Sequence, residues 1–393
     1  MKIGIYGGTF DPIHRGHITA AQAAAQQLGL DLLLLIPASI PPHKALPEGG
    51  ADAAQRLEMA TLATAELSCP AQVLDVEVRR QGKSYTADTL RTLRRQYPED
   101  ELWLLMGTDM FLSLQDWHEP QEILRLVRVA AFSRTGDPEQ QRFARQRAYL
   151  EKTFGAQVTV VENPHVVDIS STRLRQLLPE GREYLPEAVY GYILRQRLYG
   201  THAELKHLTP EELRPIALSF LKPKRMPHVL GTEQEAIRLA RRYGADETDA
   251  RIAALLHDCT KKLDMEQQLA LCRRYDIRLD ELEQHALKLL HAKTGAAVAR
   301  DIFGVKDAVY EAIRWHTTGK PDMTLLEKVI YLADYIEPNR DFPGVDELRR
   351  AVYDDLDKGL LMGLSDTIDE MERMGNPVHH DTLEARDFLL RGE

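Results

Sequence analysis

The feature that most constrains this chain is a strand, a glycine-containing loop and a helix in immediate succession near its beginning. Apolar residues alternate at Ile3 and Ile5, the pair Gly7 and Gly8 follows, and an alanine-rich stretch with helical periodicity occupies 18–28. Paired glycines let the backbone approach an anion, and the first turn of a helix offers free N–H groups and the positive end of its dipole. A glycine pair alone indicates a tight turn, but this succession predicts a phosphate-binding loop.

Two histidines, His14 and His17, lie where that helix begins. Their spacing would bring both imidazoles to one spot, which suits a polyphosphate whose negative charge grows during a reaction. The complete run over 7–17, Gly-Gly-Thr-Phe-Asp-Pro-Ile-His-Arg-Gly-His, resembles the signature of the HxGH nucleotidyltransferases, and later segments narrow the resemblance to the bacterial nicotinate-nucleotide adenylyltransferases. Under this resemblance both histidines are catalytic. The nucleotide-binding residues of the loop would be Gly7, Gly8, Thr9 and Phe10.

Strand-like stretches alternate with amphipathic helical ones up to about residue 200. This alternation predicts right-handed crossovers and an α/β fold with a doubly wound parallel sheet, as in Rossmann-like nucleotidyltransferases, whose ligands bind beyond the carboxyl ends of the strands. The expected strands are 3–6, 32–36, 73–78, 102–106, 127–132 and 158–161. The expected helices are 18–28, 53–67, 86–96, 123–126 and 139–153.

Two further motifs follow expected strands. Pro41-Pro42-His43-Lys44 is by itself typical of a rigid turn with a solvated lysine, but it also resembles the family's P-x-H-K element, in which Lys44 would neutralise ATP phosphates. The hydroxyls near 84–86 suit an N-cap at the start of a helix. The resemblance adds a role for Tyr85 and Thr86 in holding the pyridine nucleotide.

An apolar strand ending in Gly107 is followed by Asp109 and, eight residues later, by Trp117. A lone tryptophan is usually a core or surface anchor. The resemblance implies that Trp117 stacks on the nicotinate ring and that Asp109 approaches the nucleotide ribose. Stacking suits a flat pyridine that carries a carboxylate, because nearby backbone N–H groups can take its charge. Under the resemblance, this stacking selects nicotinate mononucleotide as the substrate that accepts AMP, rather than the phosphopantetheine that a sister family uses.

A second signature occupies 169–175, Ile-Ser-Ser-Thr-Arg-Leu-Arg, at the start of another expected helix. A serine cap and an amphipathic stripe explain this stretch structurally. The resemblance adds that its hydroxyls, helix N–H groups and Arg175 grip the β- and γ-phosphates of ATP. The hydroxyls in question belong to Ser170, Ser171 and Thr172. The expected reaction is attack of nicotinate mononucleotide on the α-phosphorus of ATP, with Mg²⁺ carried by the ATP and no side-chain nucleophile.

The pattern changes after residue 200. The stretch 200–208 is polar and predicts a linker, so the expected domains are 1–203 and 204–393, in line with a length of 393 residues. Thr209-Pro210-Glu211-Glu212 then has the N-cap, first-turn proline and early acids of a helix, and strand-like alternation ceases. An all-helical second domain is expected.

Histidines and aspartates interrupt apolar helical stretches of this second half: His228, His257, Asp258, His291, His316 and Asp334. Burying so many ionisable groups would be costly, whereas a bound metal favours imidazole and carboxylate. The order resembles the HD-domain metal phosphohydrolases and, with 316–319 and 334–340 included, their branch that splits diadenosine tetraphosphate symmetrically to ADP.

The resemblance also implies a binuclear metal centre. One ion would take His228, His257, Asp258 and Asp334, and the other would share Asp258 with His291 and His316. Mixed imidazole and carboxylate ligands suit iron, manganese or another first-row metal, and the resemblance makes iron the expected ion. Two ions bridged by Asp258 would activate water and clamp phosphoryl oxygens.

Other charged residues of this half leave alternatives open. Lys261 and Arg340 would neutralise the polyphosphate, but each is equally typical of a solvated surface charge. The remaining histidines fit no motif and are expected to be structural or surface residues: His118, His165, His285, His379 and His380.

Composition restricts the partners. A formal net charge of −10 argues against a surface that coats nucleic acid, so the expected partners are ATP, nicotinate mononucleotide and diadenosine tetraphosphate or related nucleotides. The 3 cysteines form no motif, which favours a reduced cytoplasm. The longest apolar run, 32–36, is too short for a membrane span, and no leader pattern precedes the first strand.

Other functions remain open at this point. The helical half could be a non-catalytic nucleotide-sensing or oligomerising module, or an HD nucleotide phosphatase of another substrate. The first half could use nicotinamide mononucleotide as its acceptor. The oligomeric state is open too.

Overall fold

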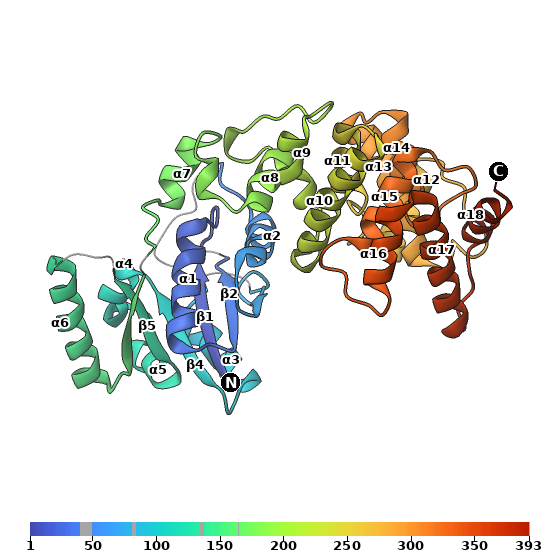
Figure 1. The fold of residues 1–393 in the computed structure, drawn as a ribbon. Helices are drawn as coiled ribbons and strands as arrows, with labels where there is room; N and C mark the ends of the chain where they lie inside the picture. Colours follow the sequence, from blue (N-terminus) through green and yellow to red (C-terminus); the bar gives the residue numbers. More distant parts are fainter. Residues whose placement is uncertain (40–48, 81–83, 134–136, 164, 393) are drawn as a thin grey trace. The chain divides into compact units, whose positions relative to one another are not determined.

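The computed structural model describes residues 1–39, 49–80, 84–133, 137–163 and 165–392. These residues divide into two compact units, Met1–His202 and Ala203–Glu393, coloured from blue to green and from green to red in Figure 1. The expected boundary, between 203 and 204, lies one residue further along the chain.

The first unit is built on a sheet of six parallel strands in the order β3-β2-β1-β4-β5-β6. The strands are β1 (Lys2–Gly8), β2 (Leu32–Pro37), β3 (Ala71–Val73), β4 (Glu101–Met106), β5 (Arg128–Ser133) and β6 (Val158–Glu162). The order reverses between β1 and β4, as it does in a doubly wound sheet, and this reversal is where such sheets bind ligands. The fold class predicted from the alternating pattern is confirmed.

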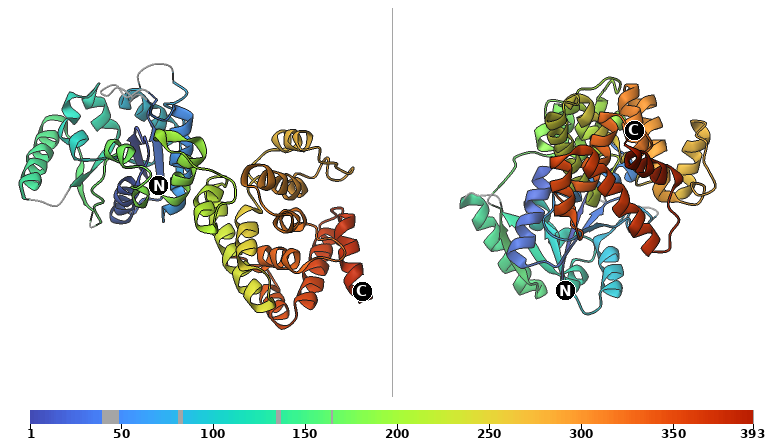
Figure 2. Two further views of the ribbon diagram at one scale, coloured as in Figure 1. Left: turned by 90° about the horizontal axis from the view of Figure 1, so that it is seen from above. Right: turned by 45° about the vertical axis from the view of Figure 1, so that its right-hand side comes forward.

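Helices lie on both sides of this sheet (Figure 2). On one face, alternate residues of β1, Ile3 and Ile5, join a buried apolar cluster with side chains of α3, α5 and α6. Helix α1 packs against β1, and α2 packs against β2 and β3. The helices of this unit are α1 (Arg15–Leu28), α2 (Ala53–Ala63), α3 (Thr86–Gln96), α4 (Thr108–Leu112), α5 (Pro120–Leu126), α6 (Asp137–Phe154), α7 (Ser171–Leu177) and α8 (Glu187–Gln196).

The strand expected at 73–78 is wrong for most of its length. Strand β3 ends at Val73, and the chain then turns, with the N–H of Arg79 bonded to the carbonyl of Asp75 at 2.9 Å. The Arg79 guanidinium also pairs with the Asp75 carboxylate at 2.7 Å. Because β3 is the edge strand, no further strand competes with these local bonds, and the alternation of apolar residues is overridden.

The second unit is helical, and its described residues form no strand. Helix α9 begins as expected: Thr209 is the N-cap, its side chain accepts the N–H of Glu212, and the Glu212 carboxylate accepts the N–H of Thr209. The helices are α9 (Pro210–Leu218), α10 (Met226–Tyr243), α11 (Glu247–Leu256), α12 (Met265–Arg274), α13 (Leu287–Phe303), α14 (Asp307–Trp315), α15 (Leu325–Ile336), α16 (Val345–Asp354), α17 (Leu356–Arg373) and α18 (His380–Arg391). Within the described ranges, no helix is both long and apolar enough to cross a membrane.

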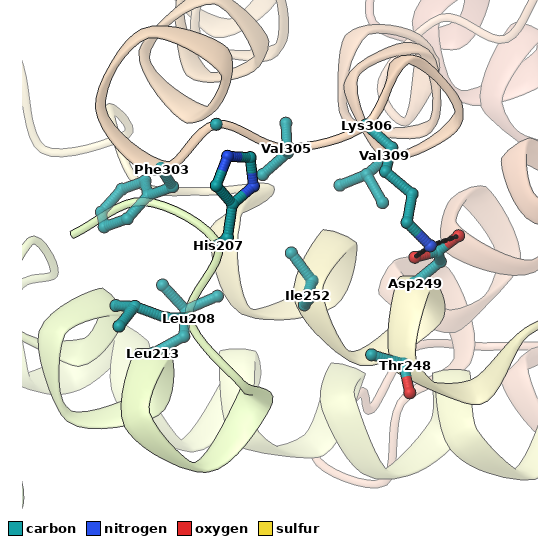
Figure 3. A pocket seen from close by; sticks show the side chains of 11 residues that line it. His207, Leu208, Leu213, Thr248, Asp249, Ile252, Phe303, Val305, Lys306 and Val309 are labelled. Carbon is teal, nitrogen blue, oxygen red and sulfur yellow. Dashed lines mark hydrogen bonds and ion pairs between the residues drawn. The ribbon is translucent and has the colours of Figure 1, made fainter. Parts of the chain in front are cut away.

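The linker is shorter than the expected 200–208, because both of its ends are anchored. The Thr201 hydroxyl is buried and donates to the carbonyl of Leu198 at 2.8 Å. The N–H of His207 donates to the carbonyl of Phe303 at 2.9 Å, and its ring lies over Gly304, where a Cβ would come within 3.0 Å of the imidazole. His207 lines a small cavity of about 170 Å³, and Figure 3 shows its ring near the side chains of Phe303 and Val305.

Candidate functional sites

The loop that follows β1 borders a cavity at the sheet reversal. The cavity has a volume of about 400 Å³ and lies beyond the carboxyl ends of β1, β2 and β4. Of the residues predicted to bind nucleotide or act on it, those lining the cavity are Gly7, Gly8, Thr9, His17, Tyr85, Thr86 and Trp117. The cavity is therefore lined by the glycine loop, by an imidazole and by aromatic rings together.

His14 and His17 lie together at the start of α1, with ring centroids 3.7 Å apart. The N–H of His14 donates to Nδ1 of His17 at 3.2 Å, so we assign the proton of the neutral His17 ring to Nε2. Burial lowers the pKa of His14 to about 4, and burial together with His14 lowers the pKa of His17 well below its ordinary value. Both rings are thus neutral hydrogen-bonding groups at neutral pH.

Gly16 makes this pairing of rings possible. A Cβ at Gly16 would lie 3.0 Å from Nδ1 of His14 and 3.2 Å from the carbonyl oxygen of Val167. Any larger residue would push the imidazole or the 167 segment away. Gly16 therefore lets the loop and the stretch before the second signature approach each other closely.

The second signature is docked onto the loop by direct hydrogen bonds. Ser171 Oγ donates to the carbonyl of Pro12 at 2.9 Å, and Arg175 Nη1 donates to the carbonyl of Asp11 at 2.5 Å. Ser170 caps α7 by accepting the N–H of Arg173 at 3.2 Å, and Thr172 Oγ1 accepts from Arg175 at 3.4 Å. Both signatures, predicted separately, therefore meet at the same loop.

Sequence reasoning missed the residues that hold this loop in place. The Asp11 side chain is buried, and its Oδ1 accepts the N–H of Ala51 at 3.0 Å and the hydroxyl of Tyr199 at 2.6 Å. Arg56 is fully buried and donates to the carbonyls of Thr9 at 2.8 Å and Ala38 at 2.5 Å. Asp11 could have been found because it lies inside the signature, but nothing local marks Tyr199.

Two residues that were not predicted also line this cavity, His118 and Glu77. The His118 ring packs against the Tyr85 ring at 4.4 Å and lines the cavity, although His118 was expected to be a structural or surface residue. The turn that replaces the expected strand places Glu77 in the lining of the cavity. There the Glu77 carboxylate accepts a hydrogen bond from Thr89 Oγ1 at 2.8 Å. Burial raises the pKa of Glu77.

Other predicted residues of this site lie elsewhere. Phe10 is buried beneath the loop, with its ring edge against the Tyr6 ring at 5.7 Å. Asp109 is exposed in the first turn of α4 and is not among the residues that line the cavity. Lys44 falls outside the described residues.

The second unit brings all six predicted metal ligands into one cluster. His228 comes from α10, His257 and Asp258 follow α11, His291 lies on α13, His316 follows α14 and Asp334 lies on α15. The four imidazoles and Asp258 are buried, and the Asp334 side chain is 18 % exposed.

The cluster has two overlapping parts. In one part, His228 Nε2 lies 2.9 Å from Asp334 Oδ1 and 3.3 Å from His257 Nε2. In the other, His291 Nε2 lies 3.2 Å from Asp258 Oδ1 and 3.1 Å from His316 Nε2. The side chain of Asp258 lies between these parts, with Oδ2 3.6 Å from His257 Nε2.

The far side of each imidazole is occupied by an acceptor. His257 Nδ1 lies 2.6 Å from the carbonyl oxygen of Ala254. His291 Nδ1 lies 2.7 Å from that of Lys288, and His316 Nδ1 lies 2.6 Å from that of Ile313. In His228, Nδ1 lies 3.1 Å from Glu337 Oε1. We assign the ring protons to Nδ1, because each faces an acceptor, which leaves the Nε2 lone pairs directed into the cluster.

This donor set fits a metal centre. Facing Nε2 lone pairs repel each other unless a cation lies between them, and burial lowers the pKa of His257, His291 and His316 to about 4, so a proton does not fill that role at neutral pH. Asp258 Oδ1 is buried and makes no hydrogen bond with any described residue. Each of these buried groups would gain a partner from a divalent ion.

Cationic side chains surround the open side of the cluster. Lys261 Nζ lies 2.9 Å from His291 Nε2, and Arg340 Nη2 lies 2.7 Å from Asp334 Oδ1. Both line a cavity of about 320 Å³, and burial lowers the pKa of Lys261. Arg225, which was not predicted, pairs with Asp258 Oδ2 in the same cavity. The basic run 222–225, just before the first ligand, is the signal that could have identified it.

Comparisons with known proteins match each unit separately. A cytidylyltransferase-like family model matches residues 5–177, and an HD-domain family model matches residues 225–339. A protein of Gloeobacter violaceus named probable nicotinate-nucleotide adenylyltransferase is 42% identical over 209 residues, covering 51% of this chain and 98% of that protein.

Relatives of the HD-domain part are equally similar. The symmetrical bis(5′-nucleosyl)-tetraphosphatase of Halalkalibacterium halodurans is 41% identical over 179 residues, covering 44% of this chain and 95% of that protein. The corresponding protein of Bacillus subtilis is 42% identical over 183 residues, covering 46% of this chain and 98% of that protein. The chain therefore belongs to two families at once, the nicotinate-nucleotide adenylyltransferases through its cytidylyltransferase-like part and the symmetrical bis(5′-nucleosyl)-tetraphosphatases through its HD domain.

Proposed function

We propose that the first unit transfers AMP from ATP to nicotinate mononucleotide, giving nicotinate adenine dinucleotide and pyrophosphate. The observation that carries this proposal is one cavity lined both by the loop, through Gly7, Gly8 and His17, and by the rings of Tyr85 and Trp117. Phosphates suit the loop, and a flat pyridine ring suits the aromatic side chains. Family membership supports the same reaction.

Each phosphate-facing group has a role in this reaction. The acceptor phosphate attacks the α-phosphorus in line, so the chain supplies positioning and charge neutralisation and no nucleophile. His17 presents Nε2–H, which strengthens as a donor when negative charge develops on the leaving pyrophosphate. His14 and Arg175 lie at the same loop and would act with it, together with Lys44 by resemblance and Mg²⁺ brought by ATP.

A panel of acceptors tests this proposal. The purified chain is given ATP and Mg²⁺ with nicotinate mononucleotide, nicotinamide mononucleotide or phosphopantetheine, and pyrophosphate release is measured. We expect the nicotinate compound to have the highest kcat/KM. Preference for the nicotinamide compound would overturn the substrate assignment while leaving adenylyl transfer in place.

We propose that the second unit hydrolyses diadenosine tetraphosphate to two ADP. The carrying observation is the convergence of six ligand groups, five of them buried, beside Lys261, Arg225 and Arg340. His228, His257, Asp258 and Asp334 would hold one ion, and Asp258, His291 and His316 a second, with iron the preferred metal by resemblance. When bound, the ions activate water and neutralise phosphoryl oxygens. The three cationic side chains would bind the polyphosphate and orient its central bond toward the cluster.

A second candidate is a nucleotide-sensing module without catalysis. It is favoured by the two ion pairs, Arg225 with Asp258 and Arg340 with Asp334, which occupy carboxylates that a metal would need. Incubating the chain with diadenosine tetraphosphate, with and without chelator, distinguishes the hydrolase from the sensing module. Release of ADP alone that chelator abolishes supports hydrolysis, whereas nucleotide binding without products supports the module.

The proposed compartment of both reactions is the cytoplasm. Cys69, Cys259 and Cys272 are all free thiols, and two of them are buried, which suits a reducing environment. Titration of the folded and the unfolded chain with a thiol reagent tests this. Three reactive thiols after unfolding are expected from protein isolated without reductant.

A further inference from the structure

A second cluster of imidazoles and carboxylates lies outside the HD ligands, where α18 begins. His379 is the N-cap of α18, and His380 and Asp381 are its first residues. Asp280 and Glu283 lie in the connection between α12 and α13, about a hundred residues before α18 in the sequence. The cluster therefore joins two segments that are far apart in sequence.

Three ligand atoms of the cluster converge. His379 Nε2 lies 3.0 Å from Asp280 Oδ2, and His380 Nδ1 lies 3.5 Å from the same oxygen. The two rings are stacked, with centroids 4.4 Å apart and planes 28° apart. One atom from each of these three residues lies within 4.8 Å of the others. Ligands about 2.0–2.1 Å from a tetrahedral ion lie roughly 3.3 Å from one another, so these separations suit one small cation.

The His379 ring gives an independent indication of a missing partner. Its side chain is only 3 % exposed, and its Nε2 makes no hydrogen bond of acceptable geometry with any described residue. Glu283 Oε1 lies 3.6 Å away but is already paired with Lys293. A buried ring nitrogen between two carboxylates is directed toward the point where Asp280 and His380 also meet.

A third carboxylate lies on the opposite side of both rings. Asp381 Oδ2 lies 3.5 Å from His379 Nδ1, and Asp381 Oδ1 lies 3.3 Å from His380 Nε2. Histidines that bind metals usually donate their other ring N–H to a carboxylate, which fixes the tautomer. The N–H of Asp381 donates to His379 Nδ1 at 3.2 Å, so binding an ion at Nε2 would break this cap and move the ring proton to Nδ1, toward the Asp381 carboxylate.

We propose that Asp280, His379 and His380 form a site for a divalent transition-metal ion of the Zn²⁺ class, separate from the HD cluster. Two imidazoles and one carboxylate suit this class, and water would complete the coordination. Asp381 acts as the positioning carboxylate for both histidines. The ion would tie the α12–α13 connection to the start of α18, which makes its role structural. A proton on His379, whose pKa Glu283 and the other carboxylates raise, is the competing occupant.

The test uses the full chain carrying Asp258→Ala, which removes the shared ligand of the HD cluster. Zn²⁺ binding is measured by equilibrium dialysis and elemental analysis after addition of His380→Ala, Asp280→Asn or Asp381→Asn. His285→Ala is the matched control, because His285 is also an exposed histidine of this unit. We expect His380→Ala and Asp280→Asn to bind one Zn²⁺ fewer per chain and Asp381→Asn to bind the same ion at least ~10-fold more weakly. His285→Ala should match the parent.

Thermal melting distinguishes metal binding from simple loss of structure. With chelator present, the parent and His380→Ala should melt at nearly the same temperature, because the His380 side chain is 59 % exposed. Added Zn²⁺ should raise the Tm of the parent more than that of His380→Ala. Equal metal content in parent and His380→Ala, or an identical Zn²⁺ response of their Tm values, would overturn the proposal and leave a protonated His379 paired with carboxylates.

Discussion

In the first unit, the groups that we propose to bind phosphate lie mainly in one stretch, from Gly7 to His17, whereas the proposed metal ligands of the second unit are side chains brought together by five helices. Neutral imidazoles can strengthen their hydrogen bonds as ligand charge grows, without any buried cation. The HD cluster is instead a set of imidazole lone pairs and carboxylates that would be stabilised by the proposed metal ions. Substitutions in the first site should therefore change rates, and substitutions in the second should change metal content and stability.

The largest expected effect is that of Asp258→Ala. Because Asp258 lies between the two parts of the cluster, its loss should remove both ions and all hydrolysis of diadenosine tetraphosphate. Adenylyl transfer should be unchanged, because its donors lie in the other unit. Elemental analysis beside the two activity assays makes the measurement, with the exposed Asp341→Ala as control. Full hydrolysis by Asp258→Ala would reduce the second unit to a binding module.

Next in size is His17→Ala in the first unit. It removes a donor whose hydrogen bond strengthens with leaving-group charge, so kcat for adenylyl transfer should fall ~10²-fold or more, with a smaller effect on acceptor binding. Steady-state kinetics with each substrate varied checks this split. His165→Ala, an exposed histidine of the same unit, should keep parental rates. A change confined to the KM of the acceptor would place His17 outside the phosphate site.

His316→Ala should have a more limited effect than Asp258→Ala. It removes one ligand of the ion that His291 and Asp258 also hold, and it leaves the contacts among His228, His257 and Asp334 in place. We expect about half of the parental metal content and a large loss of hydrolysis. Loss of all metal would show that the two parts of the cluster bind their ions only together. A metal content equal to that of the parent would show that His316 is not a metal ligand.

A smaller effect should follow from pH. Because the folded pKa of His14 is about 4, below the ordinary value of 6.5, the unfolded chain takes up the proton first. The free energy of unfolding of the first unit should therefore decline as pH falls from about 6.5 to about 4, by at most ~3 kcal/mol. Calorimetric melting across this interval measures the decline, and His14→Gln should flatten it. A steeper profile in His14→Gln would contradict the assignment.

Least change is expected from separating the units, because residues 1–202 and 203–393 form two compact units and the fold class changes between them. Residues 1–203 and 204–393, expressed apart, should each fold and keep their own activity. Circular dichroism, melting and both assays check this. Two insoluble or molten fragments would show that the units share one core.

The local sequence pattern was sufficient to predict elements that are determined by interactions between residues close in sequence. The helix 86–96 was predicted at its observed bounds, and the cap at Thr209 was recognised from its own residues. The strand at 73–78 was wrong, because alternation cannot reveal an edge position where local turn bonds prevail. The same error concealed Glu77, which enters the cavity only because of that turn.

Site residues that act through distant contacts could not be found in this way. The motifs named the groups that are expected to bind the ligands, but not the residues that hold those groups in place. Tyr199 reaches Asp11 across most of the first unit's chain length, and Glu337 orients His228 from another helix end. Neither has a local signature. The backbone carbonyls that direct the three other imidazoles leave no trace in residue identity at all.

The convergence of four Nε2 atoms and two carboxylates also links this protein to the metal supply of its cell. If metal ions hold this cluster as proposed, the second unit reaches its full stability only where that metal is available. The loop of the first unit has no such dependence, because its imidazoles are neutral and its amides are fixed by the backbone. Under metal starvation, a chain of this design would keep its biosynthetic half and lose its hydrolytic half, so the ratio of the two activities would report on the metal available during folding.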